Sequence, residues 1–518
     1  MKILVVSILR LGDILISTSV LRNLKQQFPN AEIHVLINGR FASVSQLIPY
    51  VSKVYGLESD NICTIVESYD HSLLEGYLRL EELVTQLQAE SYDKVINLTR
   101  NRLSGWLTTL LGCSDTKGMM YSKQGKFISG SSWFEYLNVR ENSGNGNIYH
   151  FVDSFHYGAG LHTSDRRFEF RESERGREFA RRLLNRTKNS TRFLIQWSGD
   201  EAQSAFSTAK WKRIAELVKS TDPLVDIFIV GTPTEAKAVE EFCSGTPFIP
   251  AIGHLDEIFS LFQNSHVLLT CDNAIKHLAS ATKIQVLELS FGQAEFRKTG
   301  VYTSNAVILK QKTDIEVSVE IVALFSGALL RRDEVGLRSL AQECLDEVEA
   351  FRTHINDLGD WSAYPVAEKF SSAEIASWID RASSKLWLER AHEKQIGEFG
   401  SEGVELKHLL ERIFPDRSGT AWLSELRSLE SRFTWLNHQF ETYLGKLKDV
   451  LPRFDTPTAM DRYLGELKSF CQEMEPLSIF QSYADELGLA LQEAGEGVVP
   501  FQFIRKIRGA ALGCPPAL

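Results

Sequence analysis

The sequence predicts an α/β protein with two mostly parallel sheets, followed by a region built of helices alone. Strand and helix patterns alternate over residues 1–165, and the alternation begins again at residue 193. Strands separated by helices are typical of βαβ units, which build parallel sheets. Beyond residue 330 only helix patterns remain. We therefore expect domains at residues 1–165, 166–330 and 331–518, as the length of the chain also suggests.

The first domain begins with a short apolar strand at residues 3–6, as expected for a buried parallel strand. A helix follows, because apolar residues from Ile14 to Phe28 recur at helical spacing and Pro29 ends the pattern. Further strands are expected at 32–37, 51–57 and 94–98, and further helices at 73–88 and 103–111. The composition of residues 141–147 predicts a surface loop.

The second domain follows a charged, arginine-rich segment at residues 165–190, which we interpret as a helical bridge. Its strands are expected at 193–197, 225–230, 266–270 and 285–289, and its helices at 211–218, 235–242, 255–262 and 274–281. Two such domains facing each other leave a cleft at the carboxyl ends of their strands, where ligands bind in α/β proteins.

The last third shows helical periodicity only. Apolar residues from Leu337 to Phe351 are spaced as on one helix face, and those from Leu426 to Val450 alternate in steps of three and four. We expect this second stripe to form the core of a helical bundle rather than a cofactor site.

Composition is that of an ordinary globular chain, with 43% hydrophobic and 24% charged residues. No apolar run is long enough for a membrane span, and the N-terminus is interpreted as a strand rather than a signal peptide. The seven cysteines are scattered without CxxC spacing, which favours a reducing compartment over a disulfide framework or zinc site. Residues 331–518 hold 22 Lys/Arg and 31 Asp/Glu, and no basic face indicates nucleic-acid binding.

The first candidate functional segment joins the first strand to its helix and contains Gly12 and Asp13. A strand, a glycine-bearing turn and a helix N-terminus often form a ligand site, and glycine permits close backbone approach. The alternative is that Asp13 only caps the helix and complements its dipole.

The second candidate segment runs from Leu268 to Ala281, where a strand passes into a helix through Asp272, Asn273 and Ala274. Backbone N–H groups at a helix start can hold a diphosphate, with Lys276 and His277 as further cationic or donor groups. The alternative is an N-cap with a surface lysine and a packed histidine. Together the two segments suggest that Asp13 abstracts a proton while the second domain binds a phosphate leaving group.

With these motifs, the chain resembles glycosyltransferase family 9, the ADP-heptose:lipopolysaccharide heptosyltransferases, over about residues 1–325. The family opens with a strand, a short loop and Gly-Asp, and its second domain carries Asp-(Thr/Ser)-Gly-x-x-His-x-Ala-(Ala/Ser)-Ala. This sequence has Gly12-Asp13 and Asp272–Ala281 at those places. Further matches are the turn at 196–199, Trp211, the segment 230–235 and Phe291-Gly292.

The resemblance implies a GT-B architecture of two Rossmann-like domains and an inverting, metal-independent transfer from a nucleotide-sugar, with an ADP-sugar as donor. It implies that Asp13 is the base, that Asp272 contacts the donor sugar, and that Glu235 contacts the ribose or nucleobase. It implies that Asn273, Ala274 and His277 bind the donor phosphates. Gly12 and Ser198 complete the donor-binding set.

The sequence departs from the family at two places. Asn273-Ala274 stand where the family has Thr-Gly, and the family's phosphate-binding lysine is missing near residues 204–207. We expect Lys210 or Lys276 to replace that lysine.

The leading interpretation is a cytoplasmic bacterial enzyme that glycosylates a surface glycan, a lipid-linked acceptor or a protein, with peripheral contact at the inner membrane. The region 331–518 is expected to govern acceptor choice, self-association or binding of a protein partner. Two alternatives stay open: a GT-B nucleotide-sugar epimerase or hydrolase, and a non-catalytic scaffold acting through the helical region.

Overall fold

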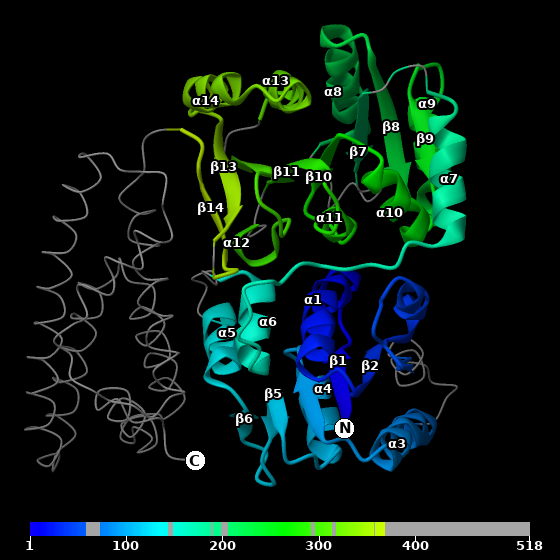
Figure 1. Ribbon diagram of the computed structural model, residues 1–518, viewed down its shortest axis with the longest axis vertical. Helices are drawn as coiled ribbons and strands as arrows, with labels where there is room; N and C mark the ends of the chain where they lie inside the picture. Colours follow the sequence, from blue (N-terminus) through cyan, green and yellow to red (C-terminus); the bar gives the residue numbers. More distant parts are fainter. Residues whose placement is uncertain are drawn as a thin grey trace, which may run out of the picture. The chain divides into compact units, whose positions relative to one another are not determined.

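The computed structural model describes residues 1–58, 73–142, 149–187, 189, 191–197, 206–291, 296–312, 317–356 and 358–367. The chain divides into two compact units, one of residues 1–135 and 149–369 and the other of residues 136–148 and 370–518. Both sheets lie in the first unit (Figure 1). The helices predicted after residue 370, including the stripe at 426–450, lie outside the described residues, as do residues 143–147 of the predicted loop.

The first sheet has six strands among the described residues, in the order β3-β2-β1-β4-β5-β6. Its strands are β1 (Lys2–Ser7), β2 (Glu32–Asn38), β3 (Lys53–Leu57), β4 (Lys94–Asn97), β5 (Thr116–Tyr121) and β6 (Phe127–Ser129). All pairs are parallel except β5 with β6. The helical elements of this half are α1 (Leu11–Gln27), η1 (Gly39–Gln46), α3 (Leu73–Ala89), α4 (Arg102–Leu110), α5 (Ser132–Asn142) and α6 (Phe151–Ala159).

The second sheet has eight strands among the described residues, in the order β14-β13-β12-β11-β10-β7-β8-β9. Its strands are β7 (Thr191–Gln196), β8 (Val225–Gly231), β9 (Ile249–Ile252), β10 (Val267–Cys271), β11 (Gln285–Ser290), β12 (Val307–Gln311), β13 (Val348–Ile355) and β14 (Trp361–Pro365). The helical elements are α7 (Glu174–Leu184), α8 (Thr208–Thr221), η2 (Pro233–Glu235), α9 (Ala236–Cys243), α10 (Leu255–Gln263), α11 (Lys276–Ala279), α12 (Phe296–Thr299), α13 (Val319–Arg331) and α14 (Glu334–Glu343).

The predicted α/β class with two mostly parallel sheets is confirmed. The apolar strands are buried as expected: Ile3 and Leu4 of β1 and Leu268 of β10 are fully buried. The predicted helical bridge is a helix only at α7, and the helix predicted at residues 274–281 is shorter, since α11 spans Lys276–Ala279.

The expectation of helices alone beyond residue 330 is wrong for residues 348–365, which form β13 and β14. Helix α14 ends at Glu343, and a turn follows in which the Val348 N–H donates a hydrogen bond to the Cys344 carbonyl. β13 then pairs antiparallel with β12 and β14 with β13. Pairing with the open edge of β12 outweighs the helical spacing of Leu337 to Phe351, because strand formation depends strongly on tertiary context.

The strand order in each sheet reverses beside one central strand. β1 lies between β2 and β4, and β7 lies between β8 and β10. In open α/β sheets, ligands bind outside the carboxyl ends of the strands where the order reverses. The loops after β1, β4, β7 and β10 are therefore the places where a site is expected.

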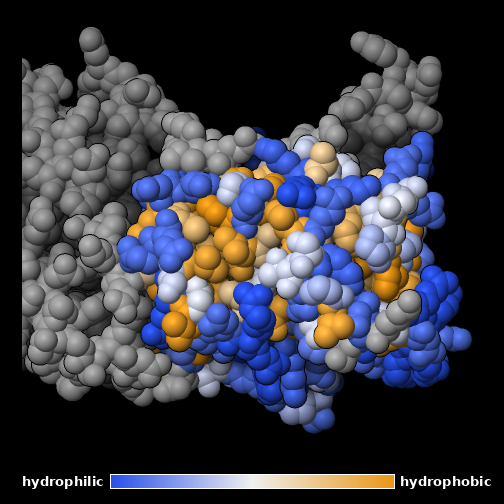
Figure 2. Space-filling view, turned by 90° about the horizontal axis from the view of Figure 1, so that it is seen from above, coloured by the Kyte–Doolittle hydropathy of each residue, from blue (hydrophilic) through white to orange (hydrophobic). Residues whose placement is uncertain are grey.

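Apolar residues are also present on the surface. The end of the second sheet's half that carries α8, α13 and α14 is seen in Figure 2, where apolar residues lie among hydrophilic ones. Leu224, Leu324 and Val335 are among the exposed large apolar residues. Scattered apolar residues are ordinary at a protein surface and by themselves indicate no docking site. Among the described helices, none is both long and apolar enough to cross a bilayer.

Candidate active site

The loop after β1 leads directly into α1 and carries Gly12 and Asp13. α1 begins at Leu11, so Asp13 lies in its first turn, where a carboxylate complements the helix dipole. Asp13 is half-buried. The loop is tied to the loop after β4, because the Ile8 N–H donates to Thr99 Oγ1 at 2.9 Å. Asp13 therefore sits where the strand order of the first sheet reverses.

The two segments singled out in the sequence lie against each other. A Cβ built on Gly12 would be 3.5 Å from Cδ2 and 3.6 Å from Nε2 of His277, and 3.8 Å from Cα of Ala274. The start of α1 thus packs on α11 and on the segment that leads into it from β10. The structure brings together Gly12, the adjacent Asp13, Ala274 and His277, although about 260 residues of chain separate them.

The side chain of Asn273 fixes the loop after β10. Its Nδ2 is within hydrogen-bonding distance of Gln196 Oε1, of Thr270 Oγ1 at 3.0 Å and of the Cys271 carbonyl at 2.9 Å. Its Oδ1 accepts from the Lys276 N–H at 3.2 Å. Gln196 ends β7, so this network links the two central strands of the second sheet. The amide of Asn273 is occupied in shaping the loop.

Lys276 is fully buried between two carboxylates. Its Nζ lies 2.5 Å from Asp272 Oδ1 and 2.6 Å from Glu288 Oε1. Burial alone would lower the pKa of Lys276, but Glu288 and Asp272 outweigh it and raise that pKa above its ordinary value. Lys276 is thus an ammonium at neutral pH. Its role toward a donor phosphate stays a prediction, and its charge is already balanced by protein groups.

His277 is a buried, neutral imidazole. Burial lowers its pKa well below the ordinary value, and the neighbouring ammonium of Lys276 adds to the effect. Its Nδ1 is buried and has no hydrogen-bond partner among the described residues. Leaving a buried polar atom unpaired costs roughly 1–3 kcal/mol, so a group that pairs with it would be stabilised there.

The remaining predicted donor-binding residues lie on other elements. Glu235, after β8, accepts from the Thr232 N–H at 2.8 Å and from its hydroxyl at 2.7 Å. Lys210, on α8, lies with its Nζ 5.8 Å from the centre of the Phe206 ring. Ser198 lies outside the described residues.

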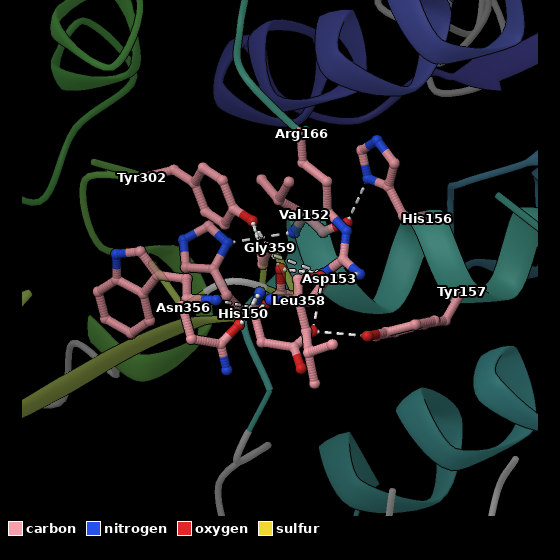
Figure 3. A network of polar contacts seen from close by, with 12 residues as sticks. His150, Val152, Asp153, His156, Tyr157, Arg166, Tyr302, Asn356, Leu358 and Gly359 are labelled. Atoms are coloured by element: carbon pink, nitrogen blue, oxygen red, sulfur yellow. Dashed lines mark hydrogen bonds and ion pairs between the residues drawn. The ribbon is translucent and has the colours of Figure 1, made fainter. Parts of the chain in front are cut away.

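A second buried polar cluster was not anticipated from the sequence (Figure 3). Asp153 of α6 accepts from Arg166 Nη1 at 2.7 Å, from the Tyr302 hydroxyl at 2.7 Å and from the Trp361 N–H at 3.0 Å. Arg166 also donates to Asp360 Oδ1 at 2.9 Å, which accepts from the Tyr157 hydroxyl at 2.6 Å. Both aspartates and Arg166 are almost fully buried.

This cluster joins α6, the extended segment before α7 and the loop between β13 and β14. The backbone there is closely packed, since Gly359 has φ +80° and a Cβ on it would collide with the Ser164 carbonyl. The sequence carries no signal for the cluster: Arg166 sits in an arginine-rich stretch, and Asp360 lies where helices were expected.

The same cluster contains His150 and adjoins His156. His150 Nδ1 accepts from the Val152 N–H at 3.1 Å, so Nε2 carries the proton it donates to the Gly300 carbonyl at 2.8 Å. Burial, followed by the charge of Arg166, lowers the pKa of His156 to about 3. Its Nδ1 donates to the Val152 carbonyl and its Nε2 accepts from Asn23 of α1. Both rings serve as neutral connectors.

No group of three or more His, Cys, Asp or Glu side chains suited to a metal ion occurs in the part of the chain that the structure describes.

Comparison with known proteins assigns most of this region. Residues 80–325 match the model of glycosyltransferase family 9 (heptosyltransferase). Over these residues the chain is similar to family 9. The resemblance expected from the sequence is thereby confirmed over residues 80–325.

The individual proteins that this chain resembles align with it over different lengths. Lipopolysaccharide heptosyltransferase 3 of Escherichia coli (strain K12) is 29% identical over 100 residues, which is 19% of this chain and about a quarter (25%) of that relative. A crystal structure of a family 9 glycosyltransferase from Veillonella parvula aligns with a TM-score of 0.50 at 16% identity, over 64% of this chain and 97% of that one. ADP-heptose LPS heptosyltransferase II of E. coli aligns with a TM-score of 0.47 at 16% identity, over 64% and 100%. The Veillonella structure shares the two-sheet fold.

Proposed function

We propose that the chain is an inverting, metal-independent glycosyltransferase with Asp13 as its general base. It moves a heptose or similar sugar from a nucleotide-diphosphate donor, an ADP-sugar, to a hydroxyl group of a bacterial surface glycan, glycolipid or protein. The observation that carries the proposal is the contact between the start of α1 and the segment after β10. Both segments follow strands beside which the strand order reverses, and the family 9 match includes the second of them.

In the proposed reaction, the carboxylate of Asp13 accepts the proton of the acceptor hydroxyl as its oxygen attacks the anomeric carbon. The new carbon–oxygen bond forms on the face opposite the diphosphate. The bond between the anomeric carbon and the diphosphate oxygen breaks, and the nucleoside diphosphate leaves with the electron pair. A positioned base contributes on the order of 10²–10⁴ in rate.

Other residues would bind the donor. Asp272 would accept from sugar hydroxyls, and the backbone around Asn273 and Ala274 would lie along the diphosphate. His277 presents an uncharged ring beside Gly12. The same proposal includes the acceptor, a cytoplasmic location with peripheral membrane contact, and a role of residues 331–518 in acceptor choice or assembly.

The test is diphosphate release from ADP-heptose by the purified chain, with and without a lipopolysaccharide-core acceptor. Asp13→Asn should lower kcat by 10² or more while leaving the Kd for ADP nearly unchanged. The matched control is Glu320→Gln, because Glu320 is an exposed carboxylate in the first turn of α13. Both variants lose the same favourable helix-dipole interaction, about 0.3–1 kcal/mol, so only the turnover should separate them.

Three results would refute the proposal in different ways. Equal turnover by Asp13→Asn and the parent would remove Asp13 as the base. Diphosphate release that does not depend on acceptor would indicate a hydrolase or epimerase. An absence of binding to ADP and ADP-heptose would favour the scaffold interpretation.

A further inference from the structure

The buried ammonium of Lys276 is held from two elements. Asp272 belongs to the loop after β10, and Glu288 lies inside β11, which pairs with β10 so that Glu288 is opposite Thr270. The side chains of Lys276 and Glu288 are 0% and 1% exposed, whereas that of Asp272 is 39% exposed. One end of this three-residue chain is therefore deep in the sheet and the other reaches the surface at the candidate site.

We propose that Lys276 is a positioning residue: its ammonium fixes the carboxylate of Asp272 for the donor sugar, and Glu288 fixes the ammonium. This inference rests on the proposed function and replaces the expectation that Lys276 binds the donor phosphate.

Glu288 anchors the arrangement from within the sheet. Its Oε1 accepts from Lys276 Nζ at 2.6 Å, and its Oε2 accepts from the Val301 N–H at 2.8 Å. Turning Lys276 toward a phosphate would leave Glu288 as an uncompensated buried charge, and breaking a buried pair in this way is strongly unfavourable. The backbone of Lys276 is also fixed, by its N–H to Asn273.

The consequence for Asp272 is that only one of its oxygens is committed. Oδ1 accepts from Lys276, and among the described residues no hydrogen bond is made to Oδ2. A carboxylate held at one oxygen and open at the other accepts from a sugar hydroxyl in a fixed direction. Holding a reacting group in place accelerates a reaction more than it strengthens ground-state binding.

The experiment separates the sugar from the phosphates by comparing ADP with ADP-heptose. The variants are Lys276→Met, Glu288→Leu and the double variant, which removes both buried charges and keeps an apolar filling. Lys283→Met is the matched control, because Lys283 is an exposed lysine between α11 and β11. Thermal unfolding of each variant is measured alongside kcat and the Kd for ADP.

We expect Lys276→Met and Glu288→Leu each to lower the melting temperature and the double variant to recover part of the loss, since the Val301 N–H still lacks its acceptor. The folded double variant should bind ADP within about twofold of the parent, since the lysine does not bind phosphate, while its kcat with ADP-heptose falls about tenfold or more. Lys283→Met should match the parent in all three measurements.

The opposite pattern overturns the inference. If the folded double variant loses ADP affinity in proportion to its loss of turnover, Lys276 binds the diphosphate. If its kcat equals that of the parent, Lys276 positions nothing. A parent chain that neither binds ADP nor releases it from ADP-heptose refutes the proposed function itself, which none of the variant comparisons can do.

Discussion

Replacing Arg166 by methionine tests whether the cluster around Asp153 holds the first unit together. Methionine keeps much of the side-chain volume but removes the guanidinium that pairs with both Asp153 and Asp360. Both carboxylates keep partners, since Tyr302 and Tyr157 still donate to them. They nevertheless lose the buried guanidinium that lies between them and offsets their charge.

Breaking a buried ion pair by removing one partner typically costs 3–5 kcal/mol. The hydrogen bonds from Arg166 to the Thr163 and Gly359 carbonyls are lost as well. We therefore expect a loss of at least about 3 kcal/mol in the free energy of unfolding. The control is Arg167→Met, because the side chain of Arg167 is 76% exposed and pairs with Asp165 at 2.7 Å. A surface pair of this kind contributes about 0–1 kcal/mol.

The assay is urea unfolding followed by tryptophan fluorescence and circular dichroism on full-length protein. The first transition of Arg166→Met should move to lower urea by roughly 1 M or more, and Arg166→Lys should fall between it and the parent. A midpoint for Arg166→Met equal to that of Arg167→Met would refute the reasoning, since the two arginines would then contribute alike.

Three further outcomes are expected. The depressed pKa of His156 means that the unfolded chain takes up a proton first, so this group alone should lower stability by roughly 1.4 kcal/mol per pH unit from about 6.5 down to about 3. His156→Asn should reduce the slope of stability against pH in urea titrations at pH 4–7, and an unchanged slope would count against the assignment. Gly12→Ala should melt at or slightly above the parent temperature, because its Cβ meets His277 at ordinary contact distance and alanine favours a helix, whereas Gly12→Trp should melt lower; equal melting of both would contradict the packing described. A chain ending at residue 355 loses Asp360 and Trp361 and should give far less folded protein than one ending at residue 369, as judged by size-exclusion yield; equal yields would show that β14 is dispensable.

The sequence predicts the central strands well because they are continuous apolar runs. β1, β8 and β10 are buried on both faces, so their hydrophobicity carries the signal directly. β13 is different: its residues fit a helix as well as a strand, and only the open edge of β12 decides between them. That edge exists only in the folded protein, so the local sequence of β13 does not indicate it.

In the candidate site, too, the sequence indicates some residues and not others. Gly12, Asp13 and the segment from Asp272 to His277 stand out because they follow strands, and the sheet order then brings them together. The partners of those residues are less visible. Glu288 lies within an apolar strand, and nothing in the sequence connects it to Lys276. Local patterns therefore indicate which residues line a site and leave open which groups hold them in place.

The origin of the partners of Asp153 has a consequence for biosynthesis. This carboxylate belongs to the first half of the chain, yet two of its partners, Tyr302 and the Trp361 N–H, come from the second half. While the ribosome is still adding the second sheet, α6 carries a charge that has no complete set of donors. The amino-terminal half therefore reaches its final stability only after β14 has left the exit tunnel, and a nascent chain halted earlier is expected to stay open to proteases around α6.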